Sequence, residues 1–352
     1  MVTMEELLSV AHEMDASDVH ISVGVPPKVR VYGDLMDMPD YPILRPEDTE
    51  ALTLSITSNY HRGVLEKCGE VDFSYTLPGL GRFRVNIFKQ KNTHAAVIRL
   101  ISEEIPLPRN LGIPNSMLEL IHKKRGLILV TGPTGSGKST TLASLIGQIN
   151  NIYPYHVITL EDPIEYLHTH KKSVVNQREM GLDSINYQNA LRVALREDPD
   201  VILVGEMRDL ETISTAITAA ETGHLVFSTL HTIGAANTID RVIDVFPPHQ
   251  QQQIRIQLAA VLEAVISQTL LPHASGRGRR AAFEIMLDNP AIKNLIREQK
   301  THQITATIQT CKKEGMITLD DALFDLYARG EITAEMAVNY AQDPQNLMKK
   351  LF

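Results

Sequence analysis

A glycine-rich turn carries the most specific chemical signal in this sequence. Residues 132–139 read Gly-Pro-Thr-Gly-Ser-Gly-Lys-Ser and match the pattern GxxxxGK[ST] in full. Glycines let several backbone N–H groups converge on one phosphate chain, and the expected helix that follows adds a partial positive charge. We expect Lys138 to neutralise the β- and γ-phosphate oxygens and the Ser139 hydroxyl to ligate Mg²⁺. The turn therefore predicts a site for MgATP and its hydrolysis, lined by Gly132, Pro133, Thr134, Gly135, Ser136, Gly137, Lys138, Ser139 and Thr140.

A carboxylate at the end of a second apolar run is the candidate for water activation. The run Val201–Val204 leads to Gly205 and Glu206, so a glycine stands where many P-loop enzymes place a Mg²⁺-binding aspartate. Acids at the carboxyl end of a parallel strand lie in the ligand crevice of such sheets. We expect Glu206 to act as a general base or to orient the attacking water. The alternative is an ordinary acid at a strand end.

Three acids follow the apolar run 157–160, namely Glu161, Asp162 and Glu165. Such a group at the end of a buried strand is costly unless it faces cations or water. We expect Glu161 and Asp162 to support Mg²⁺ or its water shell, with Glu165 as a further candidate. The alternative is a solvated acidic turn that Pro163 ends.

Two histidines flank the apolar run 225–227. His224 precedes the run and His231 follows it closely. A neutral imidazole can donate a hydrogen bond to a γ-phosphate or report its presence to a neighbouring group. Each of the two could equally be a structural histidine.

The elements that must position these residues follow from the hydrophobic pattern. Short, uniformly apolar runs at 127–130, 157–160, 201–204 and 225–227 alternate with helical stretches. This pattern is typical of an α/β domain whose parallel sheet is covered on both faces. From about residue 250 onward we expect an almost entirely helical part, with one apolar stripe made of Ile254, Leu258, Val261, Leu262 and Val265.

The first hundred residues have a different texture. A helical pattern over 4–14 is followed by strings of alternating apolar and polar residues, separated by turns at Gly33–Asp34 and Pro78–Gly79. Alternation of period two predicts an antiparallel sheet with one buried face. Prolines at 106, 108 and 114 then indicate a stiff connector. We therefore predict an N-terminal α+β domain (1–103), a proline-rich linker (104–114) and an ATPase domain (115–352).

Composition argues against several classes of partner. A net charge of −8, an aromatic content of 5% and the absence of Trp disfavour binding to nucleic acid. Only Cys68 and Cys311 occur and no CxxC is present, so a zinc site has no ligand set. The first residues lack the features of a secretory signal, and the most apolar stretch, Leu258–Leu271, is too short to span a bilayer. We expect a cytoplasmic protein unless a partner docks it to a membrane.

Together these motifs resemble the secretion ATPase superfamily, the motor ATPases of type II secretion and type IV pili. The resemblance rests on the loop at 132–139, an acidic box at 158–165, an atypical Walker B strand at 201–209 and a histidine box at 222–232. Gly205 is what this family shows. Segments 16–34 and 291–298 narrow the likeness to the pilus retraction branch, although Lys293 stands where that branch usually has Arg.

The resemblance implies a PAS-like N-terminal domain, a RecA-like C-terminal domain and a hexameric ring at the cytoplasmic side of the inner membrane. ATP hydrolysis would drive pilus retraction and twitching motility, through a PilC-like platform protein and, indirectly, the pilin fibre. ATP would bind between the two domains, with arginines of the N-terminal domain sensing or stabilising the γ-phosphate.

Candidates for those arginines come from the strand pattern. Along 81–87 the apolar side chains face one way and Arg82 and Arg84 the other, and Arg99 alternates similarly within 95–100. A planar guanidinium suits the charge that develops on a transferring phosphoryl group. Each could instead be a solvated surface arginine.

Other functions remain open at this point. A nucleotide-gated regulatory or binding module would bind ATP, oligomerise and turn it over negligibly. Within the motor class, an accessory retraction ATPase or a PilB-like extension ATPase also fits the motifs. Intact Lys138, Glu206 and His231 favour an enzyme.

Overall fold

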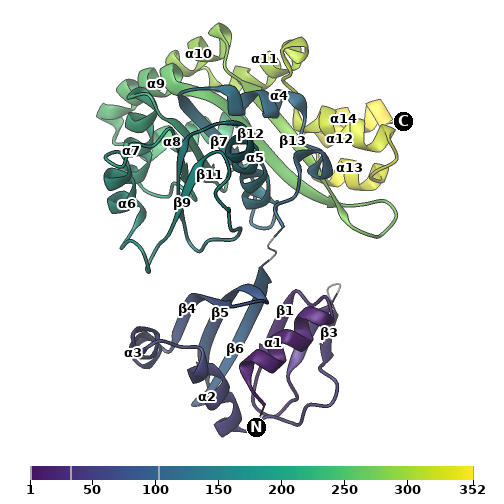
Figure 1. Cartoon of the computed structure of the whole chain (residues 1–352). Helices are drawn as coiled ribbons and strands as arrows, with labels where there is room; N and C mark the ends of the chain where they lie inside the picture. The colour runs from purple at the N-terminus through teal and green to yellow at the C-terminus, as the bar shows by residue number, and fades with distance from the viewer. Residues whose placement is uncertain (1, 32–33, 102–103, 352) are drawn as a thin grey trace. The chain divides into compact units, whose positions relative to one another are not determined.

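The computed structural model describes residues 2–31, 34–101 and 104–351. It contains two compact units (Figure 1). The first unit groups residues 1–104 with 163–167, and the second groups residues 105–162 with 168–352. The predicted domain limit at residue 103, and Gly33 of the predicted turn at Gly33–Asp34, lie outside the described residues.

The first unit is an antiparallel six-stranded sheet with helices packed on its apolar face. Its strand order is β3-β2-β1-β6-β5-β4. Alternate residues such as Phe83, Val85 and Ile87 on β5 are buried in one core, as period-two patterning requires. The strands are β1 (Asp18–Ile21), β2 (Lys28–Val31), β3 (Asp34–Asp37), β4 (Glu70–Leu77), β5 (Gly81–Gln90) and β6 (Thr93–Ile101), and the helices are α1 (Met4–Glu13), α2 (Pro46–Ser55) and α3 (Asn59–Cys68).

The second unit is built on a seven-stranded sheet of order β13-β12-β7-β11-β10-β8-β9. Every neighbouring pair is parallel except β12 and β13, which form an antiparallel hairpin. The strands are β7 (Gly126–Thr131), β8 (His156–Glu161), β9 (Val174–Glu179), β10 (Val201–Val204), β11 (Leu225–Leu230), β12 (Leu262–Pro272) and β13 (Arg279–Leu287).

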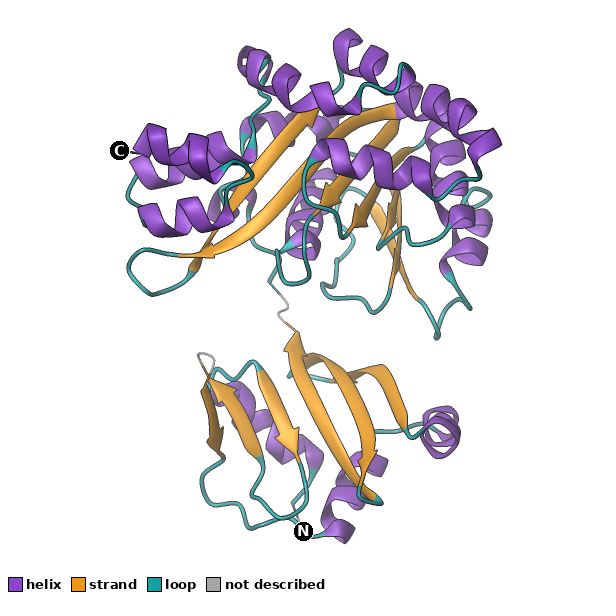
Figure 2. Ribbon diagram, turned by 180° about the vertical axis from the view of Figure 1, so that it is seen from behind, coloured by secondary structure: helices purple, strands orange, loops and turns teal. Residues whose placement is uncertain are grey.

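Helices cover both faces of this sheet (Figure 2). On β7, Leu127 and Leu129 enter one core, whereas Ile128 and Val130 enter the other. This double burial explains the uniformly apolar runs, and the structure confirms the predicted α/β class. The helices are α4 (Asn115–Leu118), α5 (Lys138–Ile152), α6 (Tyr187–Ala194), α7 (Leu210–Glu221), α8 (Ala235–Asp244), α9 (Pro248–Val261), α10 (Pro290–Arg297), α11 (Ile304–Thr310), α12 (Leu319–Ala328), α13 (Ala334–Tyr340) and α14 (Pro344–Leu351), with short 3₁₀ turns at 108–111, 119–122, 301–303 and 312–314.

The predicted helical stripe from Ile254 to Val265 is wrong in its second half. Helix α9 ends at Val261, and Leu262 begins the long strand β12. A continuous apolar run buried on both faces fits a helix and a central strand equally well, so periodicity could not separate them. The C-terminal part is therefore the β12–β13 hairpin followed by helices α10–α14, of which α12 packs on β13.

The segment predicted as a linker is partly ordered on the second unit. Residues 108–111 form a 3₁₀ turn, and Ile113 is buried in a core shared with α5. The Ser144 hydroxyl on α5 donates to the carbonyl oxygen of Pro106 at 2.7 Å. Prolines limit regular structure here, but they do not prevent packing.

Two further observations concern the chain as a whole. Within the described residues, no helix combines the length and the apolar character needed to cross a membrane. Cys68 and Cys311 are both free thiols.

Candidate functional site

The glycine-rich turn connects β7 to α5 at the carboxyl edge of the sheet. Lys138 is the first residue of α5, and its ammonium group donates to the carbonyl oxygens of Gly132 at 2.8 Å and Pro133 at 3.0 Å. The hydroxyls of Thr131 and Ser136 are buried and have no hydrogen-bond partner within the described part of the chain. A loop that holds a lysine inside it and buries unsatisfied hydroxyls fits a bound anionic group.

Two glycines of this turn are required by space as well as by backbone angle. Gly132 and Gly137 have φ values of 142° and 87°, a region that L-residues rarely adopt. A Cβ on Gly132 would lie 2.2 Å from the backbone oxygen of Gln268, and one on Gly137 would lie 2.9 Å from the Gln268 side-chain nitrogen. The turn therefore packs closely against β12.

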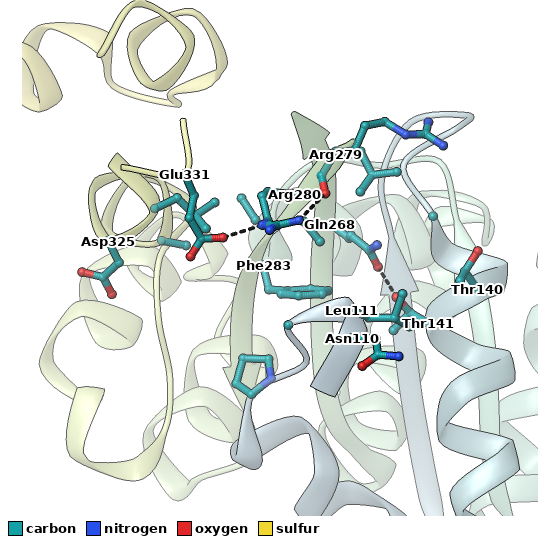
Figure 3. Close-up of a pocket in the computed structure, with 18 of the residues that line it drawn as sticks. Asn110, Leu111, Thr140, Thr141, Gln268, Arg279, Arg280, Phe283, Asp325 and Glu331 are labelled. Atoms are coloured by element: carbon teal, nitrogen blue, oxygen red, sulfur yellow. Dashed lines mark hydrogen bonds and ion pairs between the residues drawn. The ribbon is translucent and has the colours of Figure 1, made fainter. Parts of the chain in front are cut away.

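Gln268 is the residue against which the phosphate loop packs. It is 3% exposed, and its side-chain oxygen accepts a hydrogen bond from the Thr141 hydroxyl of α5 at 2.8 Å (Figure 3). Because this bond joins β12 to the first turn of α5, it fixes the direction in which α5 leaves the loop. The sequence alone does not indicate this pair, since Gln268 and Thr141 are 127 residues apart.

The other predicted residues follow the next strands of the same edge. In the sheet, β7 neighbours β11, β11 neighbours β10, and β10 neighbours β8. The carboxyl ends of these strands lead to the phosphate loop, His231, Glu206 and Glu161 respectively. With strands about 4.8 Å apart, β10 lies roughly 10 Å from β7 and β8 roughly 14 Å from it. Glu206 and His231 are thus closer to the phosphate loop than Glu161 by strand position.

Glu206 and His231 meet directly. The His231 Nε2 atom is 3.1 Å from Oε2 of Glu206, and Arg208 forms an ion pair with the other oxygen of the same carboxylate. The Glu206 side chain is only 14% exposed. Two donors therefore fix the orientation of the one carboxylate predicted to orient water. The contact with Arg208 was not expected from the sequence.

The structure gives a reason for glycine at 205. A Cβ there would lie 2.8 Å from the hydroxyl oxygen of Tyr187 and 3.1 Å from the carbonyl oxygen of Leu160. Burial first, and then the negative charges of Asp162, Glu206 and Glu161, raise the pKa of the Tyr187 hydroxyl. Tyr187, at the start of α6, therefore lies among the acids of the site, beside the position that an aspartate side chain at 205 would need.

The acidic box contributes one fixed and two exposed carboxylates. Oε1 of Glu161 accepts from the Thr159 hydroxyl at 2.6 Å and from the Gln177 amide at 3.1 Å. Asp162 is exposed, and Glu165 is exposed within the segment 163–167 that groups with the first unit. No cluster of three His, Cys, Asp or Glu side chains suited to a metal occurs among the described residues. Ser139 and the two box carboxylates supply only oxygen donors, the type Mg²⁺ prefers, and Mg²⁺ usually keeps several waters.

His224 does not reach this edge. It precedes β11, so it lies at the amino end of the strand, about 20 Å from the edge that carries His231. Its Nδ1 atom is 2.9 Å from the carbonyl oxygen of Ala219, near the end of α7. The expectation that His224 contacts a γ-phosphate is therefore wrong for a phosphate held by its own chain, and its contacts are those of a structural histidine.

The three predicted arginines share one face of the sheet in the first unit. Arg84 on β5 and Arg99 on β6 are direct cross-strand partners, and Arg82 lies two residues along β5. Arg99 donates to the carboxylate of Asp18 at 2.8 Å while its own side chain stays 64% exposed. Burial raises the pKa of Asp18, but hydrogen bonds from Ser17 and Arg99 outweigh it and lower the pKa overall.

A pocket of about 560 Å³ adjoins the phosphate loop within the second unit. Gly137, Thr140 and Gln268 line its inner end, and the β13 residues Arg279, Arg280 and Phe283 line another wall (Figure 3). The Arg280 guanidinium is held by Glu331 at 2.6 Å. The volume of the pocket falls in the range of roughly 300–1,000 Å³ that is ordinary for small-molecule sites. The sequence did not indicate this pocket, because the residues of β12 and β13 were expected to be helical.

Comparison with known proteins adds an independent line of evidence. Residues 76–335 match the family described as Type II/IV secretion system protein. The chain is 50% identical to the type IV pilus retractation ATPase PilT of Pseudomonas aeruginosa over 97% of this chain and 98% of that protein. It is 40% identical to the type IV pilus ATPase PilU of the same organism, over 97% of this chain and 90% of that protein.

A solved structure gives the same result in three dimensions. The crystal structure of the pilus retraction motor PilT with bound ADP superposes with a TM-score of 0.94 at 52% identity, and covers 99% of this chain and 100% of that one. The likeness therefore extends over both units and not over the nucleotide loop alone.

Proposed function

The chain belongs to the type II/IV secretion system protein family, and from that premise we propose that it is an ATP-hydrolysing motor that retracts type IV pili. The observation that carries the proposal is the row of Lys138, His231 and Glu206 along one sheet edge, in a chain that is 50% identical to a retraction ATPase over nearly its full length. A P-loop alone would support only nucleotide binding.

The phosphate loop holds the triphosphate. Its backbone N–H groups and the start of α5 stabilise the negative charge, and Lys138 leaves the carbonyls of Gly132 and Pro133 to pair with phosphate oxygens. Gln268 accepts a hydrogen bond from Thr141 and so holds the first turn of α5 in its position beside the loop. The adjoining 560 Å³ pocket then receives the nucleoside, beside Thr140 and β13.

Glu206 orients the attacking water. Its carboxylate is held by His231 and Arg208, so an oxygen can accept from water while the orientation of the group stays fixed. His231 directly follows β11, the strand next to β7, and senses the γ-phosphate through the same imidazole that contacts Glu206. Loss of the phosphate therefore changes the partners of His231 directly.

Mg²⁺ would be held by the Ser139 hydroxyl, with Glu161 and Asp162 acting through its water shell. When bound, the ion neutralises charge on the phosphate oxygens. Thr159 and Gln177 hold Glu161 in place for this role.

The ring assembly is the second half of the proposal. The arginine face of the first unit (Arg82, Arg84 and Arg99) supplies guanidinium groups to a nucleotide site completed by a neighbouring copy in a hexamer. The assembled motor works at the cytoplasmic face of the inner membrane and acts on the pilin fibre through a PilC-like platform protein. Hydrolysis changes which contacts between units are favourable, and this change performs the mechanical step.

A type IV pilus ATPase other than the principal retraction motor, such as an accessory retraction ATPase, is the second candidate, because the chain is also 40% identical to the type IV pilus ATPase PilU. The higher identity to PilT over the same share of the chain favours the principal retraction motor. A regulatory module without turnover would not need the fixed Glu206 carboxylate.

Deletion of the gene in its host, with complementation, tests the proposal. Wild type should restore retraction of fluorescently labelled pili and twitching. Lys138→Ala should leave extended pili that do not retract, whereas Lys349→Ala, an exposed lysine on α14, should behave as wild type. Normal retraction in the deletion strain would contradict the motor proposal, and retraction that is weakened only under load would indicate the accessory role.

A further inference from the structure

Glu284, in the middle of β13, is a buried carboxylate that the proposed reaction does not use. The residue is 2% exposed. Burial raises its pKa, although hydrogen bonds from the backbone N–H groups of Ala235 and Leu319 and from Gln342 act in the opposite direction. A buried carboxylate is costly unless donors surround it, so its partners indicate what it does.

This one carboxylate contacts the first residues of two helices. Oε1 accepts from the backbone N–H of Ala235 at 2.7 Å, and Oε2 accepts from that of Leu319 at 3.4 Å. Ala235 begins α8 and Leu319 begins α12. The first N–H groups of a helix lack partners within it, and the helix dipole favours an anion there. Glu284 therefore stabilises the amino ends of both helices at once.

On the side of α8, the contact reaches the catalytic edge. Only residues 232–234 separate His231 from α8. The Gly234 N–H donates to the hydroxyl of Ser267 at 2.9 Å, and Ser267 is the cross-strand partner of Glu284. The other end of this short segment is held by the bond between His231 and Glu206. The segment is thus fixed between the catalytic carboxylate and the Ser267–Glu284 pair.

On the side of α12, the contact reaches the C-terminal helices. Gln342, which follows α13, donates to Oε2 of Glu284 at 3.1 Å. Asp320 in the first turn of α12 accepts from the backbone N–H groups of Gln342 and Asp343 at 2.7 and 2.9 Å. A displacement of α12 or of Gln342 therefore acts directly on the carboxylate that also holds α8.

We propose that Glu284 is a positioning residue for ATP hydrolysis, which joins the segment carrying His231 to the C-terminal helices α12–α14 through one carboxylate. The inference rests on the proposed function. It extends that function because it gives the segment that carries His231 a defined connection to the C-terminal helices, of which α12 also lines the 560 Å³ pocket. Movement of the C-terminal helices shifts the position of His231. Conversely, contact between His231 and a phosphate changes the hydrogen bonds by which Glu284 holds those helices.

The first test separates positioning from binding. Glu284→Gln keeps the side-chain volume but turns an N–H₂ group toward donors that need an acceptor. We expect kcat for ATP hydrolysis to fall roughly tenfold or more, because a small displacement of a catalytic group slows the chemical step, while KM changes less than about twofold. The matched control is Glu335→Gln, the same change at an exposed acid of α13, and its kcat should stay within about twofold of wild type.

The second test asks whether the effect passes through His231. In a His231→Ala background, Glu284→Gln should lower kcat no further, since the effects of substitutions at two residues that act together are not additive. If the two losses multiply instead, Glu284 does not act through His231 and the proposal is overturned. A rise in KM with unchanged kcat would also overturn it.

A third measurement does not depend on turnover. Gln342→Ala removes a partly exposed donor on the α12 side only, and it tests the connection even if Glu284→Gln does not fold. Hydrogen exchange at the first amides of α8 (235–238) should become faster in this variant, although Gln342 lies over 100 residues away along the chain. Unchanged exchange there would refute the connection whether or not the protein hydrolyses ATP. If exchange is faster in Gln342→Ala but the wild-type protein shows no ATPase activity, the connection holds and the motor function is refuted.

Discussion

Glycine at 205 should be required by the packing of Tyr187, and not by any role of its own in metal binding. In Gly205→Ala the new Cβ would lie 2.8 Å from the Tyr187 hydroxyl oxygen and 3.1 Å from the carbonyl oxygen of Leu160. The backbone cannot retreat easily, because the Gly205 N–H donates to Leu160 at 2.7 Å and its carbonyl accepts from the Thr229 hydroxyl at 2.5 Å. Overpacking of this kind costs about 1–3 kcal/mol of unfolding free energy.

The hydroxyl of Tyr187 provides an internal control. Tyr187→Phe removes the atom that forms the closest contact and keeps the ring. In that background we expect Gly205→Ala to cost about half as much, since the contact with Leu160 remains. Denaturant unfolding followed by circular dichroism measures both costs, because the sequence has no Trp for fluorescence. A harmless Gly205→Ala, or a cost that Tyr187→Phe does not reduce, would refute this account of Gly205.

Burial lowers the pKa of His168 to about 4. The contribution of the neutral His168 to the free energy of unfolding is therefore complete above pH 6.5 and is lost, by up to about 3 kcal/mol, as the pH falls from 6.5 to 4. His168→Gln should flatten the loss of stability between pH 6.5 and 4, and an unchanged acid profile would contradict this. Gln268→Ala should cost about 1–3 kcal/mol by leaving the Thr141 hydroxyl without its acceptor and should weaken ADP binding measured by calorimetry. Gln253→Ala, at an exposed residue of α9, is the control. In mixed assemblies, Arg84→Ala subunits should lower the ATPase rate of wild-type neighbours, and a rate that falls only in proportion to the fraction of mutant subunits would exclude a role between subunits.

The sequence predicted the central sheet well because its signals are local. Each of the apolar runs 127–130, 157–160, 201–204 and 225–227 lies in a parallel strand, and each is buried on both faces. The phosphate loop follows β7 and opens α5, as the spacing of its glycines and lysine requires. Strand ends of one parallel sheet share an edge, which explains why His231 and Glu206, each expected near the end of a strand, meet in the structure.

What the sequence could not provide depends on contacts between distant residues. The run from Leu258 to Leu271 has no alternation, because both faces of β12 are buried, and only the sheet itself distinguishes it from a helix. Once β12 was misassigned, Gln268 beneath the phosphate loop and the pocket lined by β13 could not be found. His224 shows a different error. Its place in the histidine box suggested chemistry, but it lies at the amino end of β11 and therefore at the opposite edge.

The central claim is that Glu206 handles water while the phosphate loop holds the nucleotide, and Glu206→Gln tests it most directly. Purified wild type, Glu206→Gln and the control Glu66→Gln, an exposed acid on α3, would be compared for Mg²⁺-dependent ATP turnover and for ATP binding by calorimetry. The account predicts that Glu206→Gln binds ATP as wild type does and turns it over at least about 100-fold more slowly. Near-normal turnover by Glu206→Gln, or a loss of ATP binding equal to the loss of turnover, would contradict it.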